Sequence, residues 1–241
     1  MKAWLGWLVL GCALFVTNAA VGYQSDTKLF NLATKLANTG NASAQYNLGM
    51  MYNIGVGTPK DQLKAFDLFL KSTQGGDPSG AFKLACYYDG QAPKAVEYDA
   101  DLSFKYYLVA AEAGYSLAQF SIAQKYAAQE NIDKALFWFK KSASQGYDGA
   151  MSHLFVLYSD PKYGVESKAL AYKYIKQALV VADTKHHREI NRLLKTYTKY
   201  LTATKIAELN SEQYQPQPAP VTLRVKRRFG EIYDLEKNLG G

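Results

Sequence analysis

The sequence predicts an all-α fold, a solenoid of antiparallel helix pairs, on three observations. A tyrosine that follows an aliphatic residue by four positions recurs about every 35 residues, a period typical of helical repeats. Apolar residues within each segment follow the i, i+3, i+4 spacing of an amphipathic helix, and no long stretch alternates with period two. Glycine and proline interrupt the chain between these segments.

The first helix of each pair carries the recurring tyrosine. The string AQYNLGMMYNIGVG begins at Ala44 and contains Leu48 and Tyr52. Further copies of the aliphatic–tyrosine pair are Leu84 and Tyr88, Ile122 and Tyr126, and Leu154 and Tyr158. Because the copies stay in register with one another, we interpret them as one structural unit repeated four times.

The second helix of each pair carries adjacent bulky residues. These are Leu68 and Phe69, Tyr106 and Tyr107, and Trp138 and Phe139, with a weaker copy at Tyr172. Glycines suited to a left-handed helix end follow the second helices at Gly40, Gly76, Gly114 and Gly146. One such hairpin cannot bury its apolar side alone, so we expect successive pairs to stack.

These patterns predict the domain organisation. Residues 23–182 form the repeat solenoid, with units at about 41–77, 78–115, 116–147 and 148–182 after a half unit at 28–40. Residues 183–213 are expected to form C-terminal capping helices, the first with an apolar stripe at Ile190, Leu193, Leu194, Tyr197 and Leu201.

The first 22 residues have the pattern of a secretory signal peptide. Lys2 precedes an apolar run from Ala3 to Val16, and small residues follow, with cleavage expected after Ala19 or Gly22. A retained membrane anchor and lipid attachment at Cys12 are the alternatives. The apolar run is short beside the roughly 20 residues that span a bilayer. We therefore expect an exported protein, periplasmic or secreted.

The chain has few cysteines and an unevenly placed charge. Loss of the signal peptide would leave Cys86 as the single cysteine, interpreted as a buried apolar side chain or, alternatively, as half of an intermolecular disulfide. The formal net charge is +7, and residues 183–228 hold ten Lys and Arg against four Asp and Glu. The basic excess therefore belongs to one late segment.

Residues 214–241 form a proline-rich linker and a basic tail. Three prolines between Tyr214 and Pro220 indicate an extended segment. Beyond them apolar and polar residues alternate, and the basic side chains are Arg224, Lys226, Arg227 and Arg228. This tail could add as a strand to a partner's sheet, hold an anionic lipid or cell-wall surface, or remain solvated and disordered.

The sequence offers no catalytic or metal-binding constellation. Of the three histidines, His186 and His187 are adjacent and point to different sides of a helix, and His153 stands apart. The glycines of residues 55–60 follow a helix, whereas a phosphate loop follows a strand. We therefore predict a protein that is not an enzyme and has no cofactor, no metal and no small-molecule substrate. Export also makes nucleic acid an unsuitable partner.

The repeat resembles the Sel-like repeat, a relative of the tetratricopeptide repeat. The first unit matches its pattern at Ala44, Leu48, Gly49, Tyr52, Gly55, Gly57, Lys64, Ala65, Phe69 and Lys71, and the third at Lys134, Ala135, Trp138, Phe139, Lys141, Ala143 and Gly146. The second unit has an insertion around residues 92–97 and the third lacks the turn glycines. The resemblance covers residues 29–180 and implies a right-handed superhelix that assembles protein complexes.

The resemblance also implies a partner-binding groove lined by the first helices. Carried over by helical phase, it contains Tyr46, Asn47, Met50, Asn53, Phe82, Phe120 and Gln124. Tyr46, Phe82 and Phe120 share one phase, and either anchor a bound peptide or pack between units. Our main hypothesis is a scaffold that binds a protein or peptide there. The alternatives are an anionic-surface binder and, less favoured, a hydrolase of cell-wall or antibiotic substrates, because the cysteine pairs of such relatives are missing.

Overall fold

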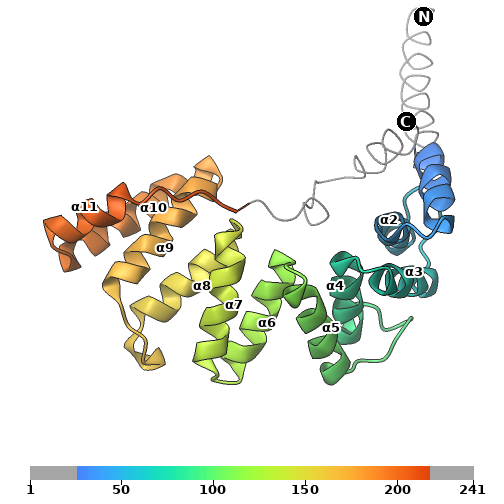
Figure 1. Cartoon of the computed structure of the whole chain (residues 1–241), viewed down its shortest axis with the longest axis horizontal. Helices are drawn as coiled ribbons and strands as arrows, with labels where there is room; N and C mark the ends of the chain where they lie inside the picture. Colours follow the sequence, from blue (N-terminus) through green and yellow to red (C-terminus); the bar gives the residue numbers. More distant parts are fainter. Residues whose placement is uncertain (1–25, 218–241) are drawn as a thin grey trace, which may run out of the picture. The chain divides into compact units, whose positions relative to one another are not determined.

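The structure, a computed structural model, describes residues 26–217, and these residues form helices and no strand (Figure 1). The all-α prediction is thereby confirmed for this part of the chain. The described residues divide into two compact units, one ending at Ser103 and one beginning at Phe104. The expected signal peptide, residues 1–22, and the basic tail with Arg224, Lys226, Arg227 and Arg228 lie outside the described residues.

The first compact unit contains the half unit and the first repeat. A helix that ends at residue 38 precedes α2 (Ala42–Ile54), α3 (Gln62–Gln74) and α4 (Pro78–Cys86). A π-type turn, η1 (Tyr87–Gln91), continues α4, and a loop then leads to α5 (Ala100–Glu112), whose first residues complete the unit. The apolar core here includes Leu29, Ala33, Leu36, Leu48 and Met51.

The second compact unit holds the remaining helices. After α5 come α6 (Ser116–Ala128), α7 (Ile132–Ser144), α8 (Asp148–Ser159) and the short η2 (Pro161–Tyr163). The unit is completed by α9 (Lys168–Val181), α10 (Thr184–Tyr197), η3 (Thr198–Tyr200) and α11 (Ala203–Ser211). From α6 to α10 each α-helix packs against the next one in the chain, which is the arrangement expected of stacked hairpins.

Local sequence signals account for the helix ends. Oδ1 of Asn41 accepts from the Ala44 amide at 2.8 Å, and Oδ1 of Asp61 accepts from the Lys64 amide at 3.0 Å. These bonds satisfy amides that the first helical turn leaves without partners. The predicted helix-ending glycines Gly40, Gly76, Gly114 and Gly146 all have φ between 85° and 93°. A left-handed conformation therefore ends the turn at each of these positions.

A glycine permits close packing inside the first repeat. A Cβ added at Gly49 of α2 would lie 2.7 Å from the ring of Phe69 on α3. Because Phe69 is fully buried, its ring is packed on all sides and cannot move to relieve this overlap. The absence of a side chain at Gly49 therefore lets the two helices of this hairpin approach.

The recurring tyrosines join one helix pair to the preceding helix. Tyr52 meets Phe30 edge to face with ring centroids 5.4 Å apart, and Tyr88 meets Phe66 in the same way at 6.0 Å. In the second compact unit Tyr126 repeats the contact with Phe104. Because aromatic rings prefer such edge-to-face geometry, each tyrosine fixes how its helix packs on the one before.

Candidate interaction surfaces

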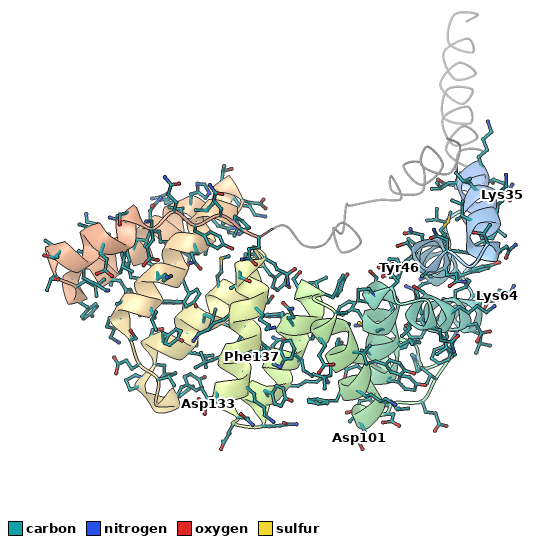
Figure 2. The ribbon with its side chains drawn as sticks, in the orientation of Figure 1. Lys35, Tyr46, Lys64, Asp101, Asp133 and Phe137 are labelled. Carbon is teal, nitrogen blue, oxygen red and sulfur yellow. The ribbon has the colours of Figure 1, made fainter. Side chains whose placement is uncertain are left out.

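Two of the predicted groove residues in the first compact unit are tied to their neighbours. The half-buried Tyr46 of α2 (Figure 2) lies with its ring 5.9 Å from that of Phe69. Oδ1 of Asn53 accepts a hydrogen bond from the Tyr87 hydroxyl at 2.7 Å. Both side chains therefore contribute to packing within this unit, although Tyr46 keeps part of its ring accessible.

The other predicted groove residues of this unit differ in exposure. Met50 and Phe82 are half-buried, and Asn47 is only 9% exposed. Asn47 directly precedes the buried Leu48 and turns with it toward the interior. Little of the Asn47 side chain can therefore reach a bound partner.

Phe120 is the centre of an aromatic cluster in the second compact unit. Its ring centroid lies 4.9 Å from Tyr147, 5.0 Å from His153 and 5.7 Å from Phe139. Gln124, one turn further along α6, is exposed, and its Nε2 lies 3.5 Å from Nε2 of His153. The cluster joins α6, α7 and α8 while leaving Phe120 half-exposed.

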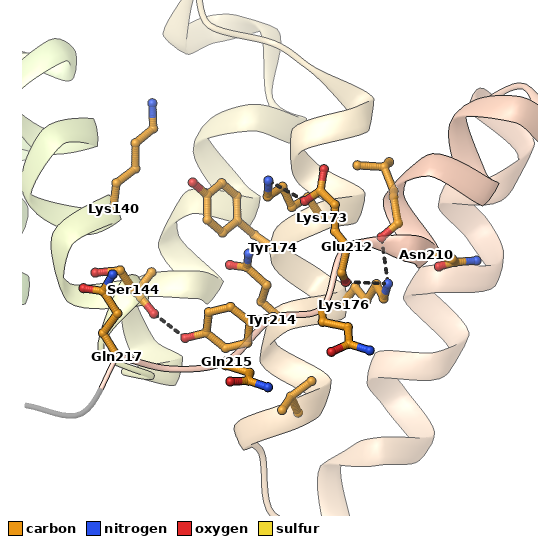
Figure 3. A pocket seen from close by; sticks show the side chains of 15 residues that line it. Lys140, Ser144, Lys173, Tyr174, Lys176, Asn210, Glu212, Tyr214, Gln215 and Gln217 are labelled. Atoms are coloured by element: carbon orange, nitrogen blue, oxygen red, sulfur yellow. Dashed lines mark hydrogen bonds and ion pairs between the residues drawn. The ribbon is translucent and has the colours of Figure 1, made fainter.

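A second surface, which the sequence did not indicate, lies between α7 and α9. It is a groove of about 670 Å³, shown from close by in Figure 3. Lys140, Lys173, Tyr174, Lys176, Gln177 and Val180 line it from the two helices. The chain after α11, residues 212–217, also lines it and is hereafter called the strap.

Four contacts hold the strap and the end of α11 on α7 and α9. Lys173 Nζ pairs with Glu212 Oε2 at 2.6 Å, and Lys176 Nζ donates to the Leu209 carbonyl at 2.7 Å. The Tyr214 hydroxyl donates to the Ala143 carbonyl, and the Gln217 amide donates to the Ser144 carbonyl at 2.8 Å. The sequence predicts a linker from residue 214 and places residues 212 and 213 in the capping segment. In the structure α11 ends at Ser211, and the strap that follows it lies against α7 and α9.

A smaller hollow of about 300 Å³ separates α10 from α8 and α9. Its lining is mainly apolar and includes Met151, Phe155, Ile175 and Leu193. The predicted apolar stripe of α10 faces this region, yet Ile190, Leu193 and Leu194 are only half-buried. The capping helix therefore covers the last repeat incompletely.

The opposite side of α10 is basic. Its exposed cations are Lys185, Arg188, Arg192 and Lys195, and Lys199 follows in η3. Asp183 and Glu189 are the nearby acidic residues, and Asp183 Oδ2 lies 3.6 Å from Lys185 Nζ. Part of the basic segment predicted from the sequence is thus an exposed helical surface.

Several titratable groups of the described residues are held by their immediate neighbours. No group of three or more His, Cys, Asp and Glu side chains within residues 26–217 could hold a metal ion. The rings of His153 and His187 each lie against a backbone carbonyl, of Gly149 and Ala182 respectively. Cys86 is 3% exposed, in agreement with its interpretation as a buried apolar side chain. Within the same residues, no helix combines the length and the apolar character needed to cross a bilayer.

Burial raises the pKa of three tyrosines to about 12: Tyr87, Tyr174 and Tyr214. The nearby Tyr158 adds to the effect at Tyr174, whose ring stacks on that of Tyr158 at 5.9 Å. Tyr87 bonds to Asn53, and Tyr214 bonds to Ala143. In each case the neutral phenol is the form that the packed environment favours.

The fold and these surfaces define a tandem helical-hairpin repeat protein. The family model for the Sel1 repeat matches residues 42–77, 78–115 and 117–147. Three of the four predicted units therefore match the Sel1 repeat, and the predicted resemblance to this repeat is confirmed. The helix pair α8 and α9 follows them as a fourth hairpin.

Two curated relatives carry related repeats. The chain is 28% identical over 138 residues to the sel1-like repeat-containing protein L21 of Acanthamoeba polyphaga mimivirus. It is 26% identical over 141 residues to chitin synthase regulatory factor 4 of Schizosaccharomyces pombe. These matches cover 56% and 58% of this chain but only 25% and 22% of the relatives, so the chain spans about a quarter of their length.

One solved structure supports the fold. A Sel1 repeat protein from Oxalobacter formigenes superposes with a TM-score of 0.59 at 19% identity, over 90% of this chain and 80% of its own. This likeness confirms the repeat-solenoid fold class. Sel1 repeat proteins are generally non-catalytic scaffolds that bind other proteins.

Proposed function

We propose that this protein is an exported, non-catalytic adaptor that binds a protein or peptide partner through the exposed faces of its first helices. The observation that carries the proposal is the set of half-exposed aromatic side chains at one helical phase, Tyr46, Phe82 and Phe120, on three successive Sel1 repeats. Aromatic side chains supply much of the binding energy at protein interfaces. Each compact unit therefore offers such rings of its own, Tyr46 and Phe82 in the first and Phe120 in the second.

The local geometry supports this use of the rings. Tyr46 rests on the buried Phe69, and Phe120 rests on the buried Phe139. A ring that is already fixed from behind loses little conformational freedom when a partner covers its remaining surface. Met50 lies one helical turn from Tyr46, and Gln124 lies one turn from Phe120, so each ring has a flexible neighbour for further contacts.

The test is capture of partners from the native envelope with wild type and with the double variant Tyr46→Ala/Phe120→Ala. We expect the double variant to lose the captured partner while its helical circular dichroism signal stays intact. Leu63→Ala/Val109→Ala, which removes two exposed apolar side chains from second helices, is the matched control and should retain it. Loss of helical signal in the double variant, or unchanged capture, would assign the rings to packing alone.

Export is part of the proposal and has a separate test. Its basis is the pattern of residues 1–22 described above. Expression of the full chain should give an envelope or secreted product that begins after Ala19 or Gly22, as read by N-terminal sequencing. A product that retains Met1 in the cytoplasm would contradict export and leave the binding proposal intact.

A second candidate function is attachment to an anionic surface. The exposed cations of α10 and η3 favour it, since five of them line the solvent side of this segment. Binding to vesicles that contain anionic lipid should then weaken strongly as salt rises from low to physiological concentration, because salt screens exposed charges. Arg188→Ala/Arg192→Ala should weaken it further. Binding that is insensitive to both changes would exclude this candidate.

A further inference from the structure

We propose that the groove between α7 and α9 is a second binding site, for an extended peptide with a carboxylate two residues before a tyrosine, and that the strap occupies it in cis. The strap itself supplies that chemistry through Glu212 and Tyr214. The site involves second helices and the chain beyond α11, so it does not depend on the first-helix faces discussed above.

The contacts of the strap show how the groove recognises a peptide. Lys173 holds the Glu212 carboxylate at 2.6 Å and lowers the pKa of that carboxyl. Lys176 Nζ donates to the backbone carbonyls of Leu209 and Glu212, at 2.7 Å and 3.4 Å (Figure 3). Lys173 therefore binds a side-chain charge, and Lys176 binds two backbone carbonyls, of Leu209 within α11 and of Glu212 in the strap.

The tyrosine subsite is built from the end of α7. The Tyr214 hydroxyl donates to the Ala143 carbonyl near the end of α7, which also accepts from the Gly146 amide at 2.9 Å. Burial of this ring is sufficient to raise the pKa of Tyr214 to about 12. Gln217 then donates its amide to the Ser144 carbonyl at 2.8 Å. The strap thus adds one hydrogen bond at each of the last two residues of α7, Ala143 and Ser144.

The groove has room and charge beyond what the strap uses. Its volume of about 670 Å³ remains with the strap in place, and Lys140, Gln177 and the 60%-exposed Val180 line it. The strap brings one carboxylate, Glu212, to a surface that carries three lysines. This imbalance favours an acidic peptide as the competing occupant.

Competition between the strap and a peptide has a measurable consequence. A tethered segment acts at a high effective concentration, so the strap blocks the groove in most molecules. The apparent affinity for a peptide falls by the fraction of molecules in which the groove is open. Loosening the strap should therefore tighten peptide binding without any new contact.

The experiment measures binding of a fluorescent peptide with the sequence of residues 209–217 to the full chain by fluorescence anisotropy. We expect Glu212→Gln/Tyr214→Ala, which loosens the strap, to bind it at least tenfold more tightly than wild type. Adding Lys173→Ala to that variant should reverse the gain by at least tenfold. Adding Lys105→Ala, a matched change of an exposed lysine in α5 that does not line the groove, should leave the affinity unchanged.

Several results would overturn the proposal. One such result is equal peptide binding by wild type and the loosened variant. Another is absence of binding by a loosened variant that keeps its full helical signal. Either result would show that the strap does not block a peptide-binding site. If the loosened variant unfolds, a second measurement tests whether the peptide displaces the strap. It is the rate of hydrogen exchange at the Gln217 amide of wild type, with and without peptide. Peptide at millimolar concentration should accelerate that exchange, and unchanged exchange overturns the proposal. Concentration-dependent dimerisation of wild type would identify a second copy as the occupant and overturn the partner assignment.

Discussion

Phe104 meets Tyr126 edge to face, with ring centroids 5.5 Å apart and the ring planes at 87°. The same relationship joins Phe30 to Tyr52 and Phe66 to Tyr88, and the sequence interval between the two rings is the same in all three pairs. The repeat is therefore defined by a contact between helices of successive pairs, which the sequence shows only as a recurring tyrosine.

The coupling between Phe104 and Tyr126 should be measurable. In a double-mutant cycle with Phe104→Leu and Tyr126→Leu, we expect an interaction free energy of about 0.5–1.5 kcal/mol, the range found for such aromatic pairs. The free energies of unfolding come from urea denaturation. Additive effects of the two changes would show that the rings contribute only by their buried area.

Gly49→Ala should destabilise the first repeat. Alanine favours a helix over glycine by about 1 kcal/mol, but its Cβ would lie 2.7 Å from the buried Phe69 ring. Such overpacking costs about 1–3 kcal/mol, so the steric effect is expected to exceed the helix preference. Thermal unfolding followed by circular dichroism measures the change.

The matched test of this explanation uses a smaller residue opposite the glycine. In a Phe69→Leu background, Gly49→Ala should be neutral or stabilising, because the overlapping ring atoms are gone. Equal destabilisation in both backgrounds would mean that the ring of Phe69 is not the cause.

The stability of the protein should fall between pH 10 and pH 12. Tyr87 has a pKa of about 12 in the folded chain against an ordinary value of 10.0. Below pH 10 the phenol is neutral in both states and its contribution is fully present. As pH rises through this window the unfolded state releases the proton first, so the contribution is lost. Urea denaturation at a series of pH values measures the slope.

Tyr87→Phe should make that slope shallower, although it also removes the hydrogen bond to Asn53. Tyr98→Phe is the control, because the Tyr98 side chain is 68% exposed. If Tyr98→Phe flattened the pH dependence as much as Tyr87→Phe, burial of Tyr87 would not explain it.

The pKa of Asp61 should be low mainly because of a backbone bond. The Lys64 amide is the largest cause of the lowering from 3.8, and the Lys64 side chain, 3.3 Å away, adds a smaller share. Lys64→Met should therefore raise the pKa of Asp61 only part of the way toward its ordinary value. Carbon-detected NMR titration of the carboxyl group measures it. Full return to the ordinary value would assign the shift to the ion pair instead.

The repeats could be predicted because their signals are local and periodic. Tyr52 and its counterparts mark the first helices, and Gly76 and its counterparts mark the ends of the second helices. The sequence predicts that the side chain of Asn47 faces the groove, because Asn47 shares a helical turn with other groove residues. In the structure this side chain is buried beside Leu48. Periodicity places a residue on a helix more reliably than it assigns the border between two faces.

The strap could not be placed from the sequence. Its residues have no helical or strand periodicity, and the contacts that hold it join Tyr214 to Ala143 and Glu212 to Lys173 across long sequence separations. Only the prolines gave a signal, and they indicate an extended chain without indicating where it lies. The groove between α7 and α9 was missed for the same reason.

The turns between successive helix pairs all have one length, whereas the loops inside the pairs do not. From α3 to α4, from α5 to α6 and from α7 to α8 the gap is identical, and Phe–Tyr contacts span the first two of these gaps. The loop between α4 and α5 is long, and the loop between α6 and α7 is short.

The entropic cost of closing a loop rises only slowly with the length of the loop. An epitope or a small guest domain inserted between Gln91 and Asp99 should therefore leave the fold of the repeats intact. A single residue added beside Gly76 would disturb the pitch of the stack.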